Sequence, residues 1–132
     1  MNSSSYGLWI PGHPQPKERP RFAKTGKAYT PKPTRDYEKV IARAWEDKYG
    51  DELIEGPLTV HVDVYSKTAD RADVDNYLKI ALDGLQGYAF ANDNKIRSVK
   101  ASKQKVDTPE EEGMRIALFT FVVRSETAST TS

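Results

Sequence analysis

The chain has 132 residues, a length that predicts one domain, and it contains no cysteine, which excludes disulfides, zinc–thiolate sites and cysteine nucleophiles. No segment resembles a signal peptide or approaches membrane-spanning length, so we expect a soluble cytosolic protein with no membrane partner. The net charge is only +1, yet basic and acidic residues are strongly segregated along the chain.

The N-terminal segment predicts a strand followed by a basic hairpin. Residues 6–10 form a short apolar run that a Pro-Gly pair stops, which is typical of a strand. Residues 21–23 and 28–30 flank a short basic segment whose glycine, Gly26, suits a turn. We therefore expect two short strands that form a hairpin.

A helix and a strand are predicted next. Apolar residues at helical spacing indicate an amphipathic helix that is capped by Thr34 or Asp36 and extends to about Tyr49, where Gly50 ends it. The residues at this spacing are Tyr37, Val40, Ile41, Ala44, Trp45 and Lys48. Residues 58–65 alternate between apolar and polar side chains, which is typical of a half-buried strand.

A second helix is predicted to begin within residues 73–75. Leu78, Leu82 and Leu85 would line its apolar face, and Gly87 is a suitable terminator. The helix therefore begins at the most acidic part of the motif considered below.

Two further strands are predicted near the C-terminus. Residues 96–106 form a basic strand, and residues 114–123 are the most apolar run, which is typical of a central strand. Residues 107–113 would join the two as a hairpin. This order of elements predicts an α+β domain with one small mixed sheet and two main helices. The domain would span residues 1–123, and a disordered polar tail would follow at 124–132.

Basic residues gather in two stretches. Residues 17–35 hold seven basic residues against the single acid Glu18, and residues 95–105 hold five with no acid. The basic residues are Lys17, Arg19, Arg21, Lys24, Lys27, Lys32, Arg35, Lys95, Arg97, Lys100, Lys103 and Lys105. Such stretches on either side of an acidic cluster suit a polyanion held over a metal site, and the alternative is ordinary solvated surface.

The acidic cluster combines carboxylates and a lysine at short spacing. Asp73 and Asp75 stand at the start of the second predicted helix, Lys79 lies one turn inside it, and Asp93 follows beyond its end. Magnesium prefers oxygen ligands and keeps several waters, so two or three carboxylates suffice to bind it. The cluster contains the groups that metal-assisted phosphodiester hydrolysis needs.

Each of these residues also has a structural explanation. Asp73 could cap the helix, and Asp75 with Lys79 could form an i,i+4 ion pair. Asn92-Asp93-Asn94 could form only a turn. Spacing alone leaves both interpretations open.

The full pattern resembles a known family. Asp73-x-Asp75-Asn76-x-x-Lys79-x-x-x-Asp83, followed by Asn92-Asp93, resembles the RusA family of Holliday-junction resolvases (crossover junction endodeoxyribonucleases) of phages and prophages. An upstream basic element also matches, and it comprises Pro16-Lys17-x-Arg19-Pro20-Arg21-Phe22 followed by Gly26-x-Ala28-Tyr29-Thr30-Pro31. Arg71, just before the aspartates, fits the family as well. The family often has two aspartates where this chain has Asn92-Asp93.

The resemblance implies a RusA-like homodimer in a bacterial or phage-infected cytosol that resolves four-way DNA by paired cleavage, without a small-molecule substrate. Asp73, Asp75 and Asp93 would coordinate Mg²⁺, with Mn²⁺ as a substitute, and Lys79 would be the catalytic lysine. The expected DNA contacts are Lys17, Arg19, Arg21, Lys24, Lys27, Arg71, Lys95, Arg97, Lys100 and Lys103. The alternatives are a non-cleaving branched-DNA-binding protein and a general flap or branched-DNA nuclease.

Overall fold

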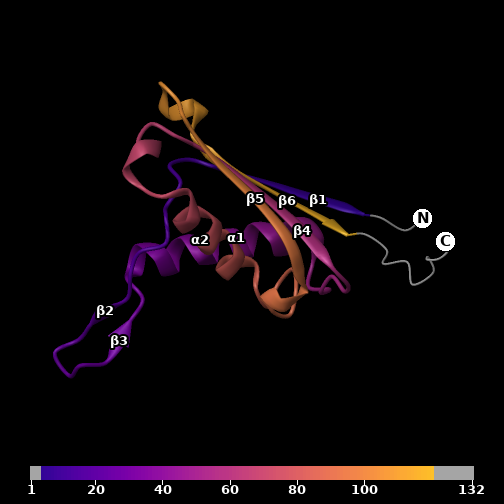
Figure 1. Ribbon diagram of the computed structural model, residues 1–132, viewed down its shortest axis with the longest axis horizontal. Helices are drawn as coiled ribbons and strands as arrows, with labels where there is room; N and C mark the ends of the chain where they lie inside the picture. The colour runs from indigo at the N-terminus through magenta and orange to yellow at the C-terminus, as the bar shows by residue number, and fades with distance from the viewer. Residues whose placement is uncertain (1–3, 121–132) are drawn as a thin grey trace.

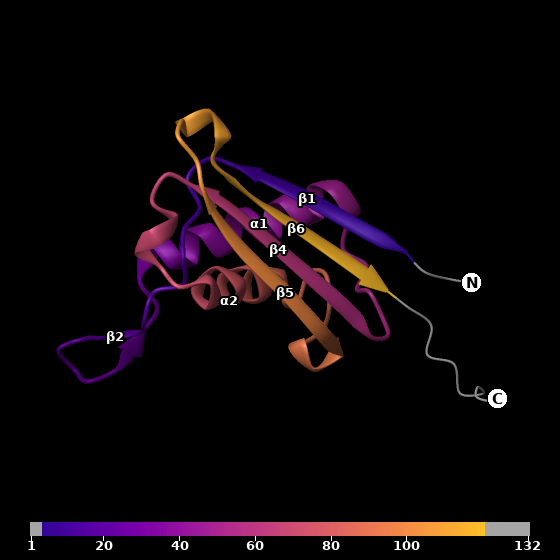
Figure 2. The same ribbon diagram turned by 45° about the horizontal axis from the view of Figure 1, so that its top comes forward.

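The sheet of this protein carries both helices on one face. The computed structural model describes residues 4–120, so the predicted tail and the end of the predicted strand 114–123 lie outside the described residues. Figure 1 shows the two helices below the sheet and a small hairpin that projects away from both. The other face of the sheet has no helix over it among the described residues (Figure 2).

The main sheet has four strands in the order β1-β6-β4-β5. They are β1 (Ser5–Pro11), β4 (Leu58–Ser66), β5 (Ile96–Lys105) and β6 (Gly113–Thr120). β6 pairs antiparallel with β1 and with β4, whereas β5 pairs parallel with β4. Parallel neighbours need a crossover connection, which α2 supplies here. The predicted α+β class with a mixed sheet and two main helices is confirmed.

The hairpin predicted between the last two strands is wrong. β5 and β6 lie on opposite sides of β4, and the connection between them crosses the end of β4 through a short 3₁₀ turn, Pro109–Glu111. The apolar residues of β6 require burial between two neighbours, and Met114, Ile116 and Leu118 are fully buried. β5 is basic and exposed along almost its whole length, so it tolerates the edge of the sheet.

Helix α1 (Lys32–Tyr49) begins earlier than predicted. Pro33 lies in its first turn, where the missing N–H of proline has no cost, and Gly50 ends the helix with a φ of 82° as expected. Its buried face is narrower than the predicted one, since Val40 is exposed. The buried residues are Thr34, Ile41, Ala42 and Trp45.

Helix α2 (Val74–Leu85) follows the predicted bounds, but its core face is rotated from the predicted one. Leu78 and Leu82 are only partly buried, and the buried residues are Tyr77, Ile80, Ala81, Gly84 and Leu85. Gly84 allows α1 and α2 to approach, because a Cβ there would lie 2.9 Å from Cβ of Ile41. No helix in the described part of the chain is long and apolar enough to span a membrane.

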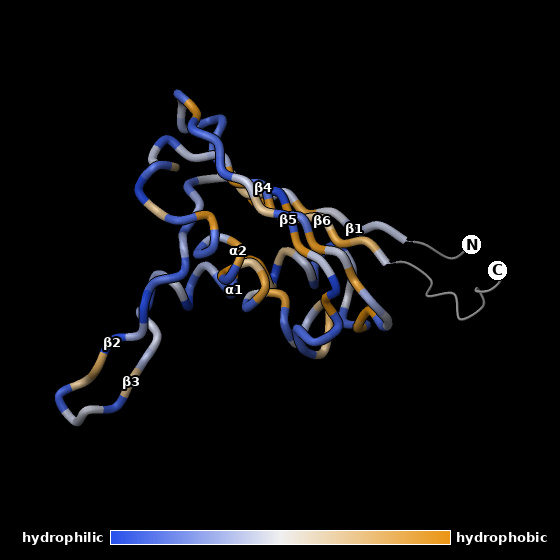
Figure 3. Tube along the Cα trace, viewed as in Figure 1, coloured by the Kyte–Doolittle hydropathy of each residue, from blue (hydrophilic) through white to orange (hydrophobic). Residues whose placement is uncertain are grey.

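The predicted basic hairpin is confirmed as β2 (Arg21–Phe22) paired with β3 (Ala28–Tyr29). Gly26 in its turn has a φ of 84°, a conformation that favours glycine. We call residues 19–30 the arm, and all of them except the half-buried Thr30 are exposed. Figure 3 shows the arm as mostly hydrophilic, with a short hydrophobic stretch on each strand.

Candidate functional site

The first turn of α2 presents two carboxylates to solvent. Asp73 is the N-cap residue and Asp75 is the second helical residue, and both are exposed. Asp73 makes no side-chain cap hydrogen bond, so it does not act as the helix cap that it could have been. Among residues 4–120, neither carboxylate has an ion pair or a hydrogen bond, and both remain available to a ligand.

Lys79 lies one turn further along the same exposed side of α2. The i,i+4 ion pair with Asp75 that the spacing allowed is not formed, and Lys79 makes no ion pair with the described residues. Asp83 pairs instead with Lys17, Oδ2 to Nζ at 2.8 Å. The structure therefore brings Asp73, Asp75 and Lys79 together without the structural pairings that would occupy them.

A buried carboxylate organises the turn that leads from β4 to the acidic motif. Glu112 accepts hydrogen bonds from the backbone N–H of Lys67 at 2.9 Å and from Nδ1 of His13 at 2.7 Å. The side chain of Glu112 is only 8% exposed. The hydroxyl of Ser66 accepts from the backbone N–H of Thr68 at 3.1 Å, which closes the same turn. These bonds fix the chain just before Asp73.

Sequence reasoning missed Glu112, because it stands in an acidic run that reads as solvated loop. The burial of Glu112 could have been inferred from its position directly before the apolar strand β6, where the chain enters the core. His13 was also given no role from the sequence.

The Glu112 network predicts a pH dependence of stability. The backbone hydrogen bond from Lys67, and then the one from His13, hold the pKa of Glu112 below its ordinary value of 4.5. The stability that this carboxylate contributes is therefore present above pH 4.5 and lost as the pH falls through the lowered pKa. In urea unfolding, Glu112→Gln is expected to flatten the loss of stability between about pH 6 and about pH 3.

Glu110→Gln is the matched control for that measurement, because Glu110 lies on the same connection and is exposed with no ion pair to the described residues. It should leave the pH profile unchanged. Parallel profiles for wild type and Glu112→Gln would contradict the assigned role of Glu112.

Asp93 lies at the other end of α2 from Asp73 and Asp75. It opens the 3₁₀ turn Asp93–Lys95 that leads directly into Ile96, the first residue of β5. Ala72, next to Asp73, accepts a hydrogen bond from Nζ of Lys103 near the far end of the same strand. The seven residue-to-residue steps from Ile96 to Lys103 span roughly 20 Å.

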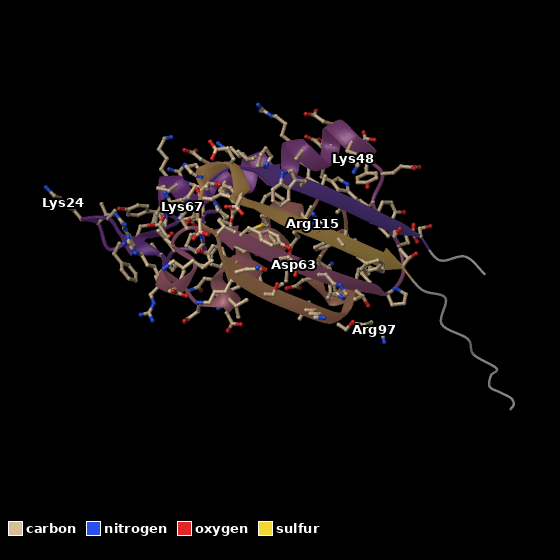
Figure 4. The ribbon with its side chains drawn as sticks, turned by 90° about the horizontal axis from the view of Figure 1, so that it is seen from above. Lys24, Lys48, Asp63, Lys67, Arg97 and Arg115 are labelled. Atoms are coloured by element: carbon tan, nitrogen blue, oxygen red, sulfur yellow. The ribbon has the colours of Figure 1, made fainter. Side chains whose placement is uncertain are left out.

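Figure 4 shows the same separation between the two ends of the sheet. Lys67, which follows β4, lies at one end, and Arg97, near the start of β5, lies at the other. No group of three potential metal-ligating side chains occurs within residues 4–120. One chain thus provides two of the three predicted carboxylates at one end of α2 and the third at its other end.

The predicted DNA-binding residues fall into two groups. Most are exposed, either on the arm or along β5 and the turn before it, and Arg71 precedes the acidic motif. Lys17 differs, because its Nζ forms ion pairs with Glu38 at 2.9 Å and with Asp83 at 2.8 Å. Burial acts to lower the pKa of Lys17, but the hydrogen bonds with Asp83 and Glu38 outweigh it and raise the pKa. Lys17 therefore ties the base of the arm to both helices.

The whole β4–α2–β5 region and its flanks match a known family. A family model described as "Endodeoxyribonuclease RusA" matches residues 11–117. No curated protein matches the chain.

Proposed function

The chain belongs to the RusA endodeoxyribonuclease family, and we propose that it resolves Holliday junctions by Mg²⁺-dependent, paired hydrolysis of DNA phosphodiester bonds. Membership of the family makes it a DNA endonuclease of the junction-resolving class that acts in recombination. The metal, the pairing of the two cuts and the roles of individual residues are our proposal. We expect the reaction to take place in a bacterial or phage-infected cytosol.

The observation that carries this proposal is the exposed set of Asp73, Asp75 and Lys79 at the start of α2, which has no ion pairs within residues 4–120. Neither carboxylate has an ion pair or a side-chain hydrogen bond among the described residues, so both can bind a cation side by side. An oxygen-only donor set fits a hard divalent cation such as Mg²⁺, and Mn²⁺ is an expected substitute. The residues present therefore fit the ion that the family implies.

We propose that a second subunit completes the site. The roughly 20 Å between Asp93 and the Asp73–Asp75 pair prevents the three from binding one ion within a chain. A two-fold axis near the middle of α2 would align two α2 helices antiparallel, so that each N-terminal end meets the C-terminal end of its neighbour. Asp93 of the partner subunit would then approach Asp73 and Asp75.

The side of the molecule formed by α2 and the edge strand β5 offers an apolar surface for that contact. Leu78 and Leu82 are only partly buried on α2, and Val99 on the neighbouring edge strand is 46% exposed. A two-fold contact uses the same patch on both subunits, so one compact apolar patch can supply both sides of a dimer interface. The predicted homodimer would thus serve catalysis as well as the symmetry of a four-way junction.

The residues of such a site divide the chemistry between them. Each cation would be held by Asp73 and Asp75 of one subunit together with Asp93 of the partner subunit. The bound cation would supply polarisation of the scissile phosphate and activation of water. Lys79 would place its ammonium against the phosphate and stabilise the negative charge that grows in the transition state. Lys100 and other exposed cations of β5 would bind flanking phosphates, which makes affinity fall as salt rises.

The proposal is tested with a labelled four-way junction, a flap substrate and a matched linear duplex, each with and without Mg²⁺. We expect two symmetric cuts in the junction that require the metal, with little cutting of linear duplex. Equal cutting of flap and junction would instead favour a general branched-DNA nuclease. Tight junction binding without cleavage in Mg²⁺ or Mn²⁺ would favour the non-cleaving alternative and contradict the proposal.

A further inference from the structure

The arm carries an aromatic ring that the rest of the described chain leaves uncovered. Phe22 is 73% exposed, the highest exposure of any large hydrophobic residue in the described chain. It pairs with Ala28 across the hairpin, so only a methyl group lies opposite its ring. Tyr29 pairs with Arg21 and therefore projects from the other face of the two-stranded ribbon.

The charge around this ring indicates what kind of molecule covers it. Residues 19–30 contain four basic residues and no acid, and Glu18 at the base of the arm pairs with Arg21 at 3.5 Å. In Figure 4, Lys24 marks the tip of the arm, far from the sheet. A cationic ribbon that exposes the rings of Phe22 (73%) and Tyr29 (47%) is complementary to DNA, which offers phosphates for the cations and base faces for an inserted ring.

The base of the arm is fixed beside the acidic motif. The backbone N–H of Lys17 donates to the carbonyl of Asn76 at 2.9 Å, directly after Asp75 in sequence. The backbone N–H of Glu18 donates to the hydroxyl of Thr34 at 3.1 Å, which adds a tie to α1. The five residue-to-residue steps from Lys17 to Phe22 reach at most about 17 Å, equivalent to about five base pairs of duplex.

From these observations we infer that the arm enters a groove of the DNA beside the branch point and that Phe22 wedges between neighbouring bases there. The inference rests on the proposed function, because it presumes a branched DNA substrate held at the start of α2. Unstacking is least costly at a branch, where the base pairs already lack a continuous stack. The wedge would therefore favour branched over linear DNA and keep the branch within about five base pairs of the scissile phosphate.

The test uses four-way junctions that carry 2-aminopurine at the branch point, without divalent metal so that no cleavage occurs. Wild-type protein is expected to raise the 2-aminopurine fluorescence on binding, and Phe22→Ala is expected to lose most of that rise. Phe22→Ala should bind the junction about 5- to 30-fold more weakly, and linear duplex no more than about twofold more weakly. Phe22→Trp should restore both the fluorescence rise and the affinity.

Val40→Ala is the matched control, because Val40 is an exposed apolar residue on α1, away from the arm. It should behave as wild type. A normal fluorescence rise with Phe22→Ala would overturn the wedge and leave the proposed function intact. Failure of wild-type protein to bind the junction at all would overturn both. Loss of the dimer in sedimentation of Phe22→Ala would show that the ring packs on a second subunit, which also overturns the wedge.

Discussion

Asp75→Asn is expected to lower the single-turnover rate of junction cleavage by at least about a hundredfold, since loss of a residue that merely supports a metal ligand already costs about 10- to 100-fold. Asp75 is exposed and has no ion pair or side-chain hydrogen bond to the part of the chain that the structure describes, so its substitution removes a cation ligand and little else. Junction binding should remain equal or become tighter, because the substitution also removes a negative charge that faces the phosphates. Retained cleavage at ordinary Mg²⁺ would contradict the assignment of Asp75 as a ligand.

Asp83→Asn is the matched control, because it makes the same chemical change on the same helix. Asp83 pairs with Lys17 and not with Lys79, so its substitution should affect the stability of the arm base and not the chemistry. The partly exposed ion pair is worth no more than about 1 kcal/mol of unfolding free energy. We therefore expect a near-normal cleavage rate from Asp83→Asn.

Lys79→Ala is expected to lower the single-turnover rate by about a hundredfold or more, if the ammonium stabilises the charge that develops in the transition state. The free energy of unfolding should change by no more than about 0.5 kcal/mol, because Lys79 is exposed and has no ion pair with the described residues. Junction affinity should fall far less than the rate. A near-normal rate would make Lys79 a surface residue without a catalytic role.

Lys100→Ala separates phosphate binding from chemistry. Lys100 is exposed on β5, away from the start of α2. Its substitution should weaken binding and reduce the salt dependence of affinity, while the cleavage rate at saturating protein stays close to wild type. Lys79→Ala and Lys100→Ala should thus show opposite patterns of rate and affinity.

Local sequence patterns predicted most of the elements, because each pattern reports a single strand or helix. The alternation in residues 58–65 and the Gly26 turn both correspond to observed elements. The partner of β5 was not predictable in the same way. It depends on the crossover through α2, which makes β5 parallel to β4, and on which edge of β4 is already paired with β6. A hairpin is the default for neighbouring strands, and tertiary burial overrode it here.

The part of the candidate site that lies on one helix was predictable from the sequence, and the part that depends on distant segments was not. The sequence placed Asp73, Asp75 and Lys79 on one helix, and helical geometry then keeps them together. The position of Asp93 depends on the register of β4 with β5, which spacing along the chain does not contain. The pairing of Lys17 with Asp83 and the burial of Glu112 likewise arise only when distant segments pack.

The measurement that tests the central claim most directly is complementation between two inactive variants. Asp75→Asn and Asp93→Asn subunits are each purified, shown to be inactive alone, and mixed under conditions of subunit exchange. If each site takes Asp93 from the partner subunit, a mixed dimer has one site with both substitutions and one intact site. The mixture should then nick one strand of a supercoiled cruciform. Absence of nicking by mixed dimers of demonstrated composition would contradict a site shared between subunits.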